Sequence, residues 1–206
     1  MKFDGPEGGP LLILAHGAGA PMDSDFMNRM TALLNEQGIR IGRFEFPYMA
    51  ERRTSGKKRP PDRAPRLLAH FREVLDQVES PVFIGGKSMG GRMATMLATE
   101  VPVKGVCVLG YPFHAPGKET PRIDHFADLQ CPVLICQGER DPMGQRAEVE
   151  GYDLGQAVEL HWLGDGNHDL APRKASGLTA EQNWLSAAQA IGDFIRRAVS
   201  QHTTAK

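Results

Sequence analysis

Residues 82–93, VFIGGKSMGGRM, decide the fold of this chain. An apolar run comes first, then a serine between glycines, and then apolar residues at helical spacing, so the stretch predicts a strand, a sharp turn and a helix. Its centre fits the G-x-S-x-G pattern of a nucleophile elbow, in which Ser88 has a strained backbone and its hydroxyl stands clear of the sheet. A β-carbon at position 86 or 90 would push the strand and the helix apart. The free amides at the start of the helix would stabilise negative charge that develops at Ser88.

Two other interpretations fit the same residues. Gly86-Lys87-Ser88 is also the end of the phosphate-binding loop of P-loop nucleotide-binding proteins. That motif needs glycine where this chain has Pro81, and residues 82–85 have the composition of a strand. A glycine-rich turn without chemistry is the second alternative, and the rest of the chain decides between the three.

Length and composition are those of one globular domain. The chain has 206 residues, a formal charge of −1, an apolar fraction of 41% and no long linker or repeat, so we expect a single domain over residues 1–206. The near-neutral charge gives no reason to expect a nucleic-acid partner. Residues 1–10 contain no apolar signal-peptide core and no apolar span of about 18 residues occurs, so we expect a cytoplasmic protein without a membrane partner. The three cysteines lie in or beside apolar runs, which predicts buried free thiols. No feature of the sequence fixes an oligomeric state.

Apolar runs and amphipathic segments alternate about six times along the chain. Strands are predicted at residues 11–15, 39–46, 82–85, 105–109, 132–137 and 157–163, and helices at residues 23–37, 67–78, after the elbow, and after a capping box of Thr179 and Gln182. Residues 47–61 are predicted to form a polar loop, and residues 121–129 a short helical stretch. This alternation predicts an α/β fold with a doubly wound, mostly parallel sheet of about six strands, helices on both faces and no lid domain.

Three polar residues, Ser88, Asp141 and His168, follow the carboxyl ends of three predicted strands. These ends share one edge of a parallel sheet, so the side chains can meet over a single pocket. His168 could take the hydroxyl proton of Ser88 and return it to a leaving group, while Asp141 would fix the imidazole tautomer and stabilise its charged form. Asp165 and Asp128 are alternative candidates for the acid.

With these residues the chain resembles the α/β-hydrolase superfamily, and within it the small, lidless members similar to dienelactone hydrolases. The resemblance covers nearly the whole chain. It rests on His16-Gly17, the elbow, Gly138-x-x-Asp141 and the glycine-rich turn that holds His168. It implies a serine hydrolase, similar to a carboxylesterase, thioesterase or lactonase, that forms an acyl-enzyme with a small ester-like substrate and needs no cofactor. Larger members begin with a β-hairpin, for which the residues before Leu11 leave little room.

The resemblance also implies an oxyanion hole made by the backbone amides of Ala18 and Met89. The place of His16 then belongs to the oxyanion loop, so we expect a structural histidine there rather than a base. The stretch 165–169 resembles the start of a calcium loop, but Leu170 stands where that loop needs glycine, so we expect no metal site.

The sequence leaves two further questions open. Tyr48, Arg52, Arg53 and Lys87 could bind an anionic group of the substrate, because residues 47–61 leave the sheet edge at which Ser88 emerges, Lys87 adjoins Ser88, and arginine pairs well with carboxylate. Alternatively, the charges of residues 47–61 could form a solvated surface or contact a protein partner. A non-catalytic interaction protein with the same fold is the alternative to an enzyme, and the intact serine, acid and histidine count against it.

Overall fold

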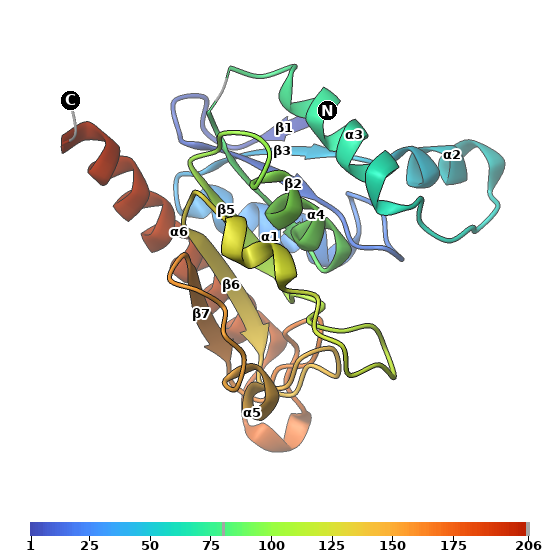
Figure 1. The fold of residues 1–206 in the computed structure, drawn as a ribbon, viewed down its shortest axis with the longest axis vertical. Helices are drawn as coiled ribbons and strands as arrows, with labels where there is room; N and C mark the ends of the chain where they lie inside the picture. The colour runs from blue at the N-terminus through green and yellow to red at the C-terminus, as the bar shows by residue number, and fades with distance from the viewer. Residues whose placement is uncertain (80, 205–206) are drawn as a thin grey trace.

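A seven-stranded sheet forms the centre of the molecule (Figure 1). The computed structural model describes residues 1–79 and 81–204. The strands are β1 Lys2–Asp4, β2 Leu11–Ala15, β3 Arg40–Phe44, β4 Phe83–Lys87, β5 Gly105–Leu109, β6 Val133–Gly138 and β7 Val158–Leu163. They lie in the order β1-β3-β2-β4-β5-β6-β7, and all neighbours are parallel except β1 and β3. The predicted doubly wound, mostly parallel sheet is confirmed.

Helices cover both faces of this sheet. The longer helices are α1 Asp25–Glu36, α2 Pro47–Ser55, α3 Ala64–Leu75, α4 Met89–Leu97 and α6 Ala180–Thr204; α5 Arg146–Val149 and the 3₁₀ helices Asp124–Asp128 and Lys174–Ser176 are short. Buried residues of α2, α3 and α4 pack in one core cluster, and buried residues of α1 and α6 pack in another. In Figure 1, α3 and α4 lie in front of the sheet and α1 lies behind it.

Each central strand contributes to both core clusters. In β2, Leu12 and Leu14 belong to the cluster under α1 and α6, whereas Ile13 and Ala15 belong to the opposite cluster. Successive side chains of a strand point to opposite faces, so a strand covered on both sides needs an apolar residue at nearly every position. This requirement explains the continuous apolar runs in the sequence.

The prediction of about six strands is too low by one. The extra strand, β1, pairs antiparallel with β3 at the edge of the sheet, and Asp4 accepts a hydrogen bond of 2.8 Å from Arg43. It has three residues, and Phe3 is exposed, so it lacks the apolar run that identified the other strands. A single edge strand fits into the short segment that leaves little room for a hairpin.

The prediction that residues 47–61 form a loop is wrong for its first part, because residues 47–55 are α2. Pro47 stands in the first turn, where its missing N–H costs nothing, and Gly56 ends the helix in the left-handed conformation with φ of 67°. Tyr48 and Met49 are buried against the sheet. The charged residues that follow them leave too few apolar positions for a helical pattern to be recognised in the sequence.

Several smaller predictions agree with the structure. Thr179 and Gln182 form the capping box of α6, with the Gln182 amide donating to Thr179 Oγ1 at 3.2 Å and the Thr179 amide donating to Gln182 Oε1 at 2.8 Å. All three cysteines are buried free thiols. The described segment between β5 and β6 holds one 3₁₀ helix and no lid domain. Within residues 1–79 and 81–204, no helix has the length and apolar character that crossing a membrane requires.

Candidate active site

Ser88 occupies a sharp turn between β4 and α4. Its φ of 51° and ψ of −116° lie in a region that side chains rarely adopt, which is the strain expected of a nucleophile elbow. A β-carbon on Gly86 would lie 2.6 Å from the carbonyl carbon of Gly90, so strand and helix touch at this point. Residues 83–87 form a regular strand paired with β5, and this leaves no loop there to wrap a phosphate.

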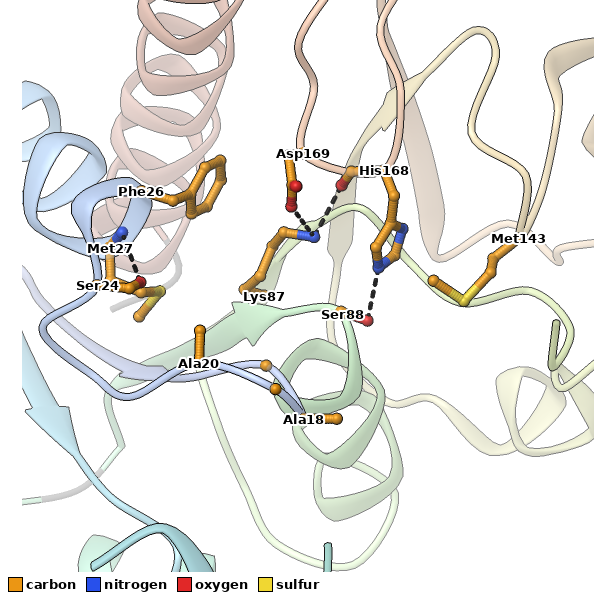
Figure 2. Close-up of a pocket in the computed structure, with 12 residues that line it drawn as sticks. Ala18, Ala20, Ser24, Phe26, Met27, Lys87, Ser88, Met143, His168 and Asp169 are labelled. Carbon is orange, nitrogen blue, oxygen red and sulfur yellow. Dashed lines mark hydrogen bonds and ion pairs between the residues drawn. The ribbon is translucent and has the colours of Figure 1, made fainter. Parts of the chain in front are cut away.

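His168 lies between Ser88 and Asp141. Its Nε2 atom is 2.8 Å from Ser88 Oγ, and its Nδ1 atom is 2.7 Å from Asp141 Oδ2 (Figure 2 shows the first contact). Because an ionised carboxylate only accepts hydrogen bonds, Nδ1 carries the imidazole proton and Nε2 is left to accept the proton of the Ser88 hydroxyl. The three residues follow β4, β6 and β7, so the topology of the sheet brings them together.

Asp141 is fully buried and held by two further donors. Gln137 Nε2 donates to Oδ2 at 3.0 Å, and the Met143 amide donates to Oδ1 at 2.8 Å. Gln137 was not among the site residues predicted from the sequence. The sequence does contain an indication of its role. Gln137 ends an apolar strand, and a buried side-chain amide in such a place needs hydrogen-bond partners. Gln137 also exchanges two hydrogen bonds with the backbone of Tyr111.

The alternative acids lie in other surroundings. Asp165 forms ion pairs with Arg173 and Arg140, and these guanidinium groups lower the pKa of its carboxyl to about 2. Asp128 ends the 3₁₀ helix that precedes β6. Asp141 is the carboxylate that contacts His168.

The loop after β2 also lines the cavity beside Ser88 and His168. Ala18 lies in this loop and lines the same cavity as Ser88, while Met89 is the first residue of α4. The first amides of a helix have no partner within the helix. His16 is fully buried, its Nδ1 atom donates to the Gly17 carbonyl oxygen at 2.7 Å, and its Nε2 atom accepts from the Phe46 amide at 3.1 Å. Burial lowers the pKa of His16 and so favours the neutral imidazole.

A cavity of about 310 Å³ opens beside Ser88 and His168 (Figure 2). Phe26 and Met27 of α1 form one wall, and Met143 of the loop after β6 forms another. Such a small, largely apolar cavity with a few polar groups at one end is typical of a site for a small molecule.

Of the four residues considered for anion binding, Lys87 lines this cavity. Arg52 and Arg53 line a separate hollow with Pro21 and Met49. Arg53 pairs with Glu45 and with Asp23, and Arg52 donates to the Gly19 carbonyl oxygen at 3.3 Å.

Tyr48 and Lys87 are both buried and bonded to the backbone of the loops beside Ser88. The Tyr48 hydroxyl donates to the Ala18 carbonyl oxygen, and Lys87 Nζ donates to the His168 carbonyl oxygen. Lys87 also forms an ion pair with Asp169. Tyr48 thus holds the loop that contains Ala18, and Lys87 holds the loop that contains His168.

Comparisons with known proteins agree with this architecture. A family model for the alpha/beta hydrolase domain matches residues 9–196. Among solved structures, Est1E from Butyrivibrio proteoclasticus superposes with a TM-score of 0.72 at 15% identity, over 96% of this chain and 93% of that one. A dienelactone hydrolase from Anabaena variabilis gives 0.70 at 21% identity, over 95% and 89%. A serine hydrolase without a lid from Xanthomonas campestris gives 0.67 at 19% identity, over 95% and 87%.

Proposed function

The chain belongs to the α/β-hydrolase family, and from that premise we propose that it is a serine hydrolase that cleaves a small ester, thioester or lactone through an acyl-enzyme. One observation carries the proposal. A single imidazole, that of His168, lies within hydrogen-bond distance of both a strained serine and a fully buried carboxylate, at the mouth of a cavity.

The first step is attack by Ser88 on the substrate carbonyl. As the Oγ–C bond forms, the hydroxyl proton passes to His168 Nε2, which lies 2.8 Å away. The imidazole becomes positively charged, and the Asp141 carboxylate stabilises that charge through its hydrogen bond to Nδ1. Gln137 and the Met143 amide keep the carboxylate in place by occupying its other acceptor positions.

The carbonyl oxygen of the substrate becomes an oxyanion in this step. We assign its stabilisation to two backbone amides, that of Ala18 in the loop that lines the same cavity and that of Met89 at the start of α4. The proton on His168 then passes to the leaving alkoxide or thiolate as its bond to carbon breaks. In the second half of the reaction, water attacks the acyl carbon as the same imidazole takes its proton. The bond from that carbon to Ser88 Oγ then breaks, and the imidazole returns the proton to Oγ.

The shape of the cavity favours a compact substrate. Its volume of about 310 Å³ lies at the lower end of the range for small-molecule sites. The wall of Phe26, Met27 and Ala20 is apolar, so we expect short acyl groups, or acyl groups with one ring, to be hydrolysed faster than long chains.

Covalent labelling tests the proposal against the alternative of a non-catalytic protein with the same fold. A fluorophosphonate probe should label the wild type and fail to label Ser88→Ala. Hydrolysis of p-nitrophenyl esters should fall by several orders of magnitude in that variant, to the residual ~10³–10⁴-fold catalysis over water that an oxyanion hole and binding alone supply.

Ser24→Ala is the matched control, because Ser24 lines the same cavity and its side chain only caps α1. This variant should be labelled like the wild type, with a loss of about 1 kcal/mol in the free energy of unfolding. Equal labelling of wild type and Ser88→Ala, or no labelling of the wild type, would contradict the proposed function.

A further inference from the structure

We propose that Lys87 is a positioning residue, which holds His168 at its hydrogen-bonding distance from Ser88 by binding the backbone of the histidine's own loop. The inference rests on the proposed function, because it assigns a task to a residue next to the nucleophile. It differs from anion binding, the role that the sequence left open for this lysine.

The contacts of Lys87 connect two segments of the site. Lys87 is the last residue of β4, directly before Ser88, and its Nζ atom donates to the His168 carbonyl oxygen at 2.7 Å. The same atom lies 3.2 Å from Asp169 Oδ1, on the next residue of that loop (Figure 2). The chain from Ser88 through Lys87 to His168 and back to Ser88 Oγ is therefore a closed ring of bonds and hydrogen bonds. Such a ring fixes the distance between nucleophile and base.

The neighbouring backbone leaves room for this contact. Gly110 has a φ of +68°, and a β-carbon there would lie 2.7 Å from the His168 carbonyl oxygen and 3.4 Å from Lys87 Nζ. On the other side, a β-carbon on Gly17 would lie 3.5 Å from Lys87 Cγ. Glycine at position 110 thus lets the loop carbonyl and the ammonium meet beside β5.

Stability alone does not explain a lysine here. The side chain is 9% exposed, and burial of a charged group is unfavourable unless it is paired. Burial lowers the pKa of the Lys87 ammonium, and the nearby Asp169 carboxylate opposes this shift. The Phe26 ring, 5.6 Å from Nζ, adds a weaker attraction. Because burial of the ammonium is unfavourable and its partner Asp169 is largely exposed, the ion pair adds little stability, and we attribute the lysine to the geometry that it fixes.

The same contacts argue against a role of Lys87 in binding a substrate anion. One hydrogen bond of the ammonium goes to a backbone carbonyl, and its charge is already balanced by Asp169. A substrate carboxylate bound to the same ammonium would lie beside Asp169, and repulsion between the two carboxylates would weaken its binding. Anion binding and positioning therefore predict different kinetic changes when Lys87 is replaced.

The test is Lys87→Met, which keeps the length of the side chain and removes the charge and the donors. With p-nitrophenyl acetate, kcat should fall roughly ten- to a hundredfold, as expected for loss of a hydrogen bond from a charged donor, while KM stays within about twofold. The melting temperature should fall by only a few degrees, because the His168 carbonyl loses one donor while the exposed Asp169 carboxylate stays hydrated. Lys87→Gln, a shorter neutral donor, is the second variant and should give an intermediate kcat. Lys58→Met, at an exposed position, is the control for loss of a lysine.

Proton NMR gives a readout that does not depend on turnover. The Nδ1 proton of His168, in its 2.7 Å hydrogen bond to Asp141, should give a downfield resonance in the wild type. That resonance should shift or broaden in Lys87→Met and remain in Lys58→Met. This measurement stays informative even if fluorophosphonate labelling shows that the proposed function is wrong.

Two outcomes would overturn the proposal. One is a labelled Lys87→Met enzyme with wild-type kcat and an unchanged His168 resonance. The other is a rise in KM confined to carboxylate-bearing esters at constant kcat, which would identify Lys87 as an anion-binding residue instead. Either result would leave the assignment of Ser88 as nucleophile intact, because that assignment depends on labelling of the wild type and of Ser88→Ala.

Discussion

The Tyr48 hydroxyl donates a hydrogen bond of 2.8 Å to the Ala18 carbonyl oxygen and thereby joins α2 to the loop beside Ser88. The neighbouring carbonyl, that of Gly17, is held by His16 Nδ1 at 2.7 Å. In a trans peptide the C=O and N–H groups point in opposite directions, so fixing the Gly17 carbonyl also fixes the direction of the Ala18 amide. The Tyr48 hydroxyl also lies 3.4 Å from the Gly17 carbonyl oxygen, so two buried side chains contact the peptide that carries the proposed oxyanion donor.

The first prediction is that Tyr48→Phe lowers kcat about fivefold and leaves KM nearly unchanged. The variant loses one hydrogen bond, with a net contribution of about 1 kcal/mol, and the Ala18 amide loses part of its support. Steady-state kinetics with p-nitrophenyl acetate measure both constants. Tyr152→Phe is the control, because Tyr152 donates its hydroxyl proton to Glu148 of α5. Equal effects of the two substitutions would show that Tyr48 does not act through the loop.

The second prediction separates the two acids that the sequence offered. Asp141→Asn should lower kcat by roughly 10⁴-fold, because an amide cannot hold the imidazole in the tautomer that accepts the serine proton. Asp165→Asn should stay within a few-fold of the wild type, since Asp165 pairs with Arg140 and Arg173. Kinetics of both variants with one ester are sufficient. A severe defect in Asp165→Asn beside a mild one in Asp141→Asn would mean that the acid is wrongly assigned.

The sequence predicted the parts of the fold that depend on short-range patterns. The strand and helix around Ser88 have a local signature, because only glycine fits where β4 and α4 touch. The meeting of Ser88, Asp141 and His168 could be predicted from topology, since parallel strands end at one edge. Neither inference needed knowledge of side-chain packing.

The features that were missed depend on long-range contacts. β1 is stabilised by pairing with β3 and by the ion pair between Asp4 and Arg43. These partners lie far along the chain, so the three residues of β1 alone do not predict a strand. Tyr48 was considered for substrate binding because Arg52 and Arg53 follow it closely, and Lys87 because it adjoins Ser88. Their hydrogen bonds to backbone carbonyls follow from the packing of α2 and of the loop after β7, which composition does not encode.

The last prediction concerns acid stability and His125, a residue outside the proposed site. His125 lies in the 3₁₀ helix after β5 and its Nε2 atom is 2.9 Å from Thr95 Oγ1 of α4. Burial, assisted by the nearby Arg92 guanidinium, lowers the pKa of His125 from 6.5 to about 4. The native protein therefore holds this imidazole neutral at a pH where an unfolded chain would protonate it.

The sign of the effect follows from proton linkage. Between pH 6.5 and about 4 the unfolded state binds more protons at His125 than the native state does, so acid favours unfolding. The contribution is fully present above pH 6.5 and is lost as the pH falls through this window. In His125→Gln this titration is absent. Its melting temperature should therefore fall less than that of the wild type between pH 7 and pH 4, and the difference measured at pH 7 reports the altered contacts with Thr95 and with the Phe126 ring. Thermal unfolding of both proteins at several pH values checks this, and parallel curves would show that His125 does not contribute to the acid sensitivity of the fold.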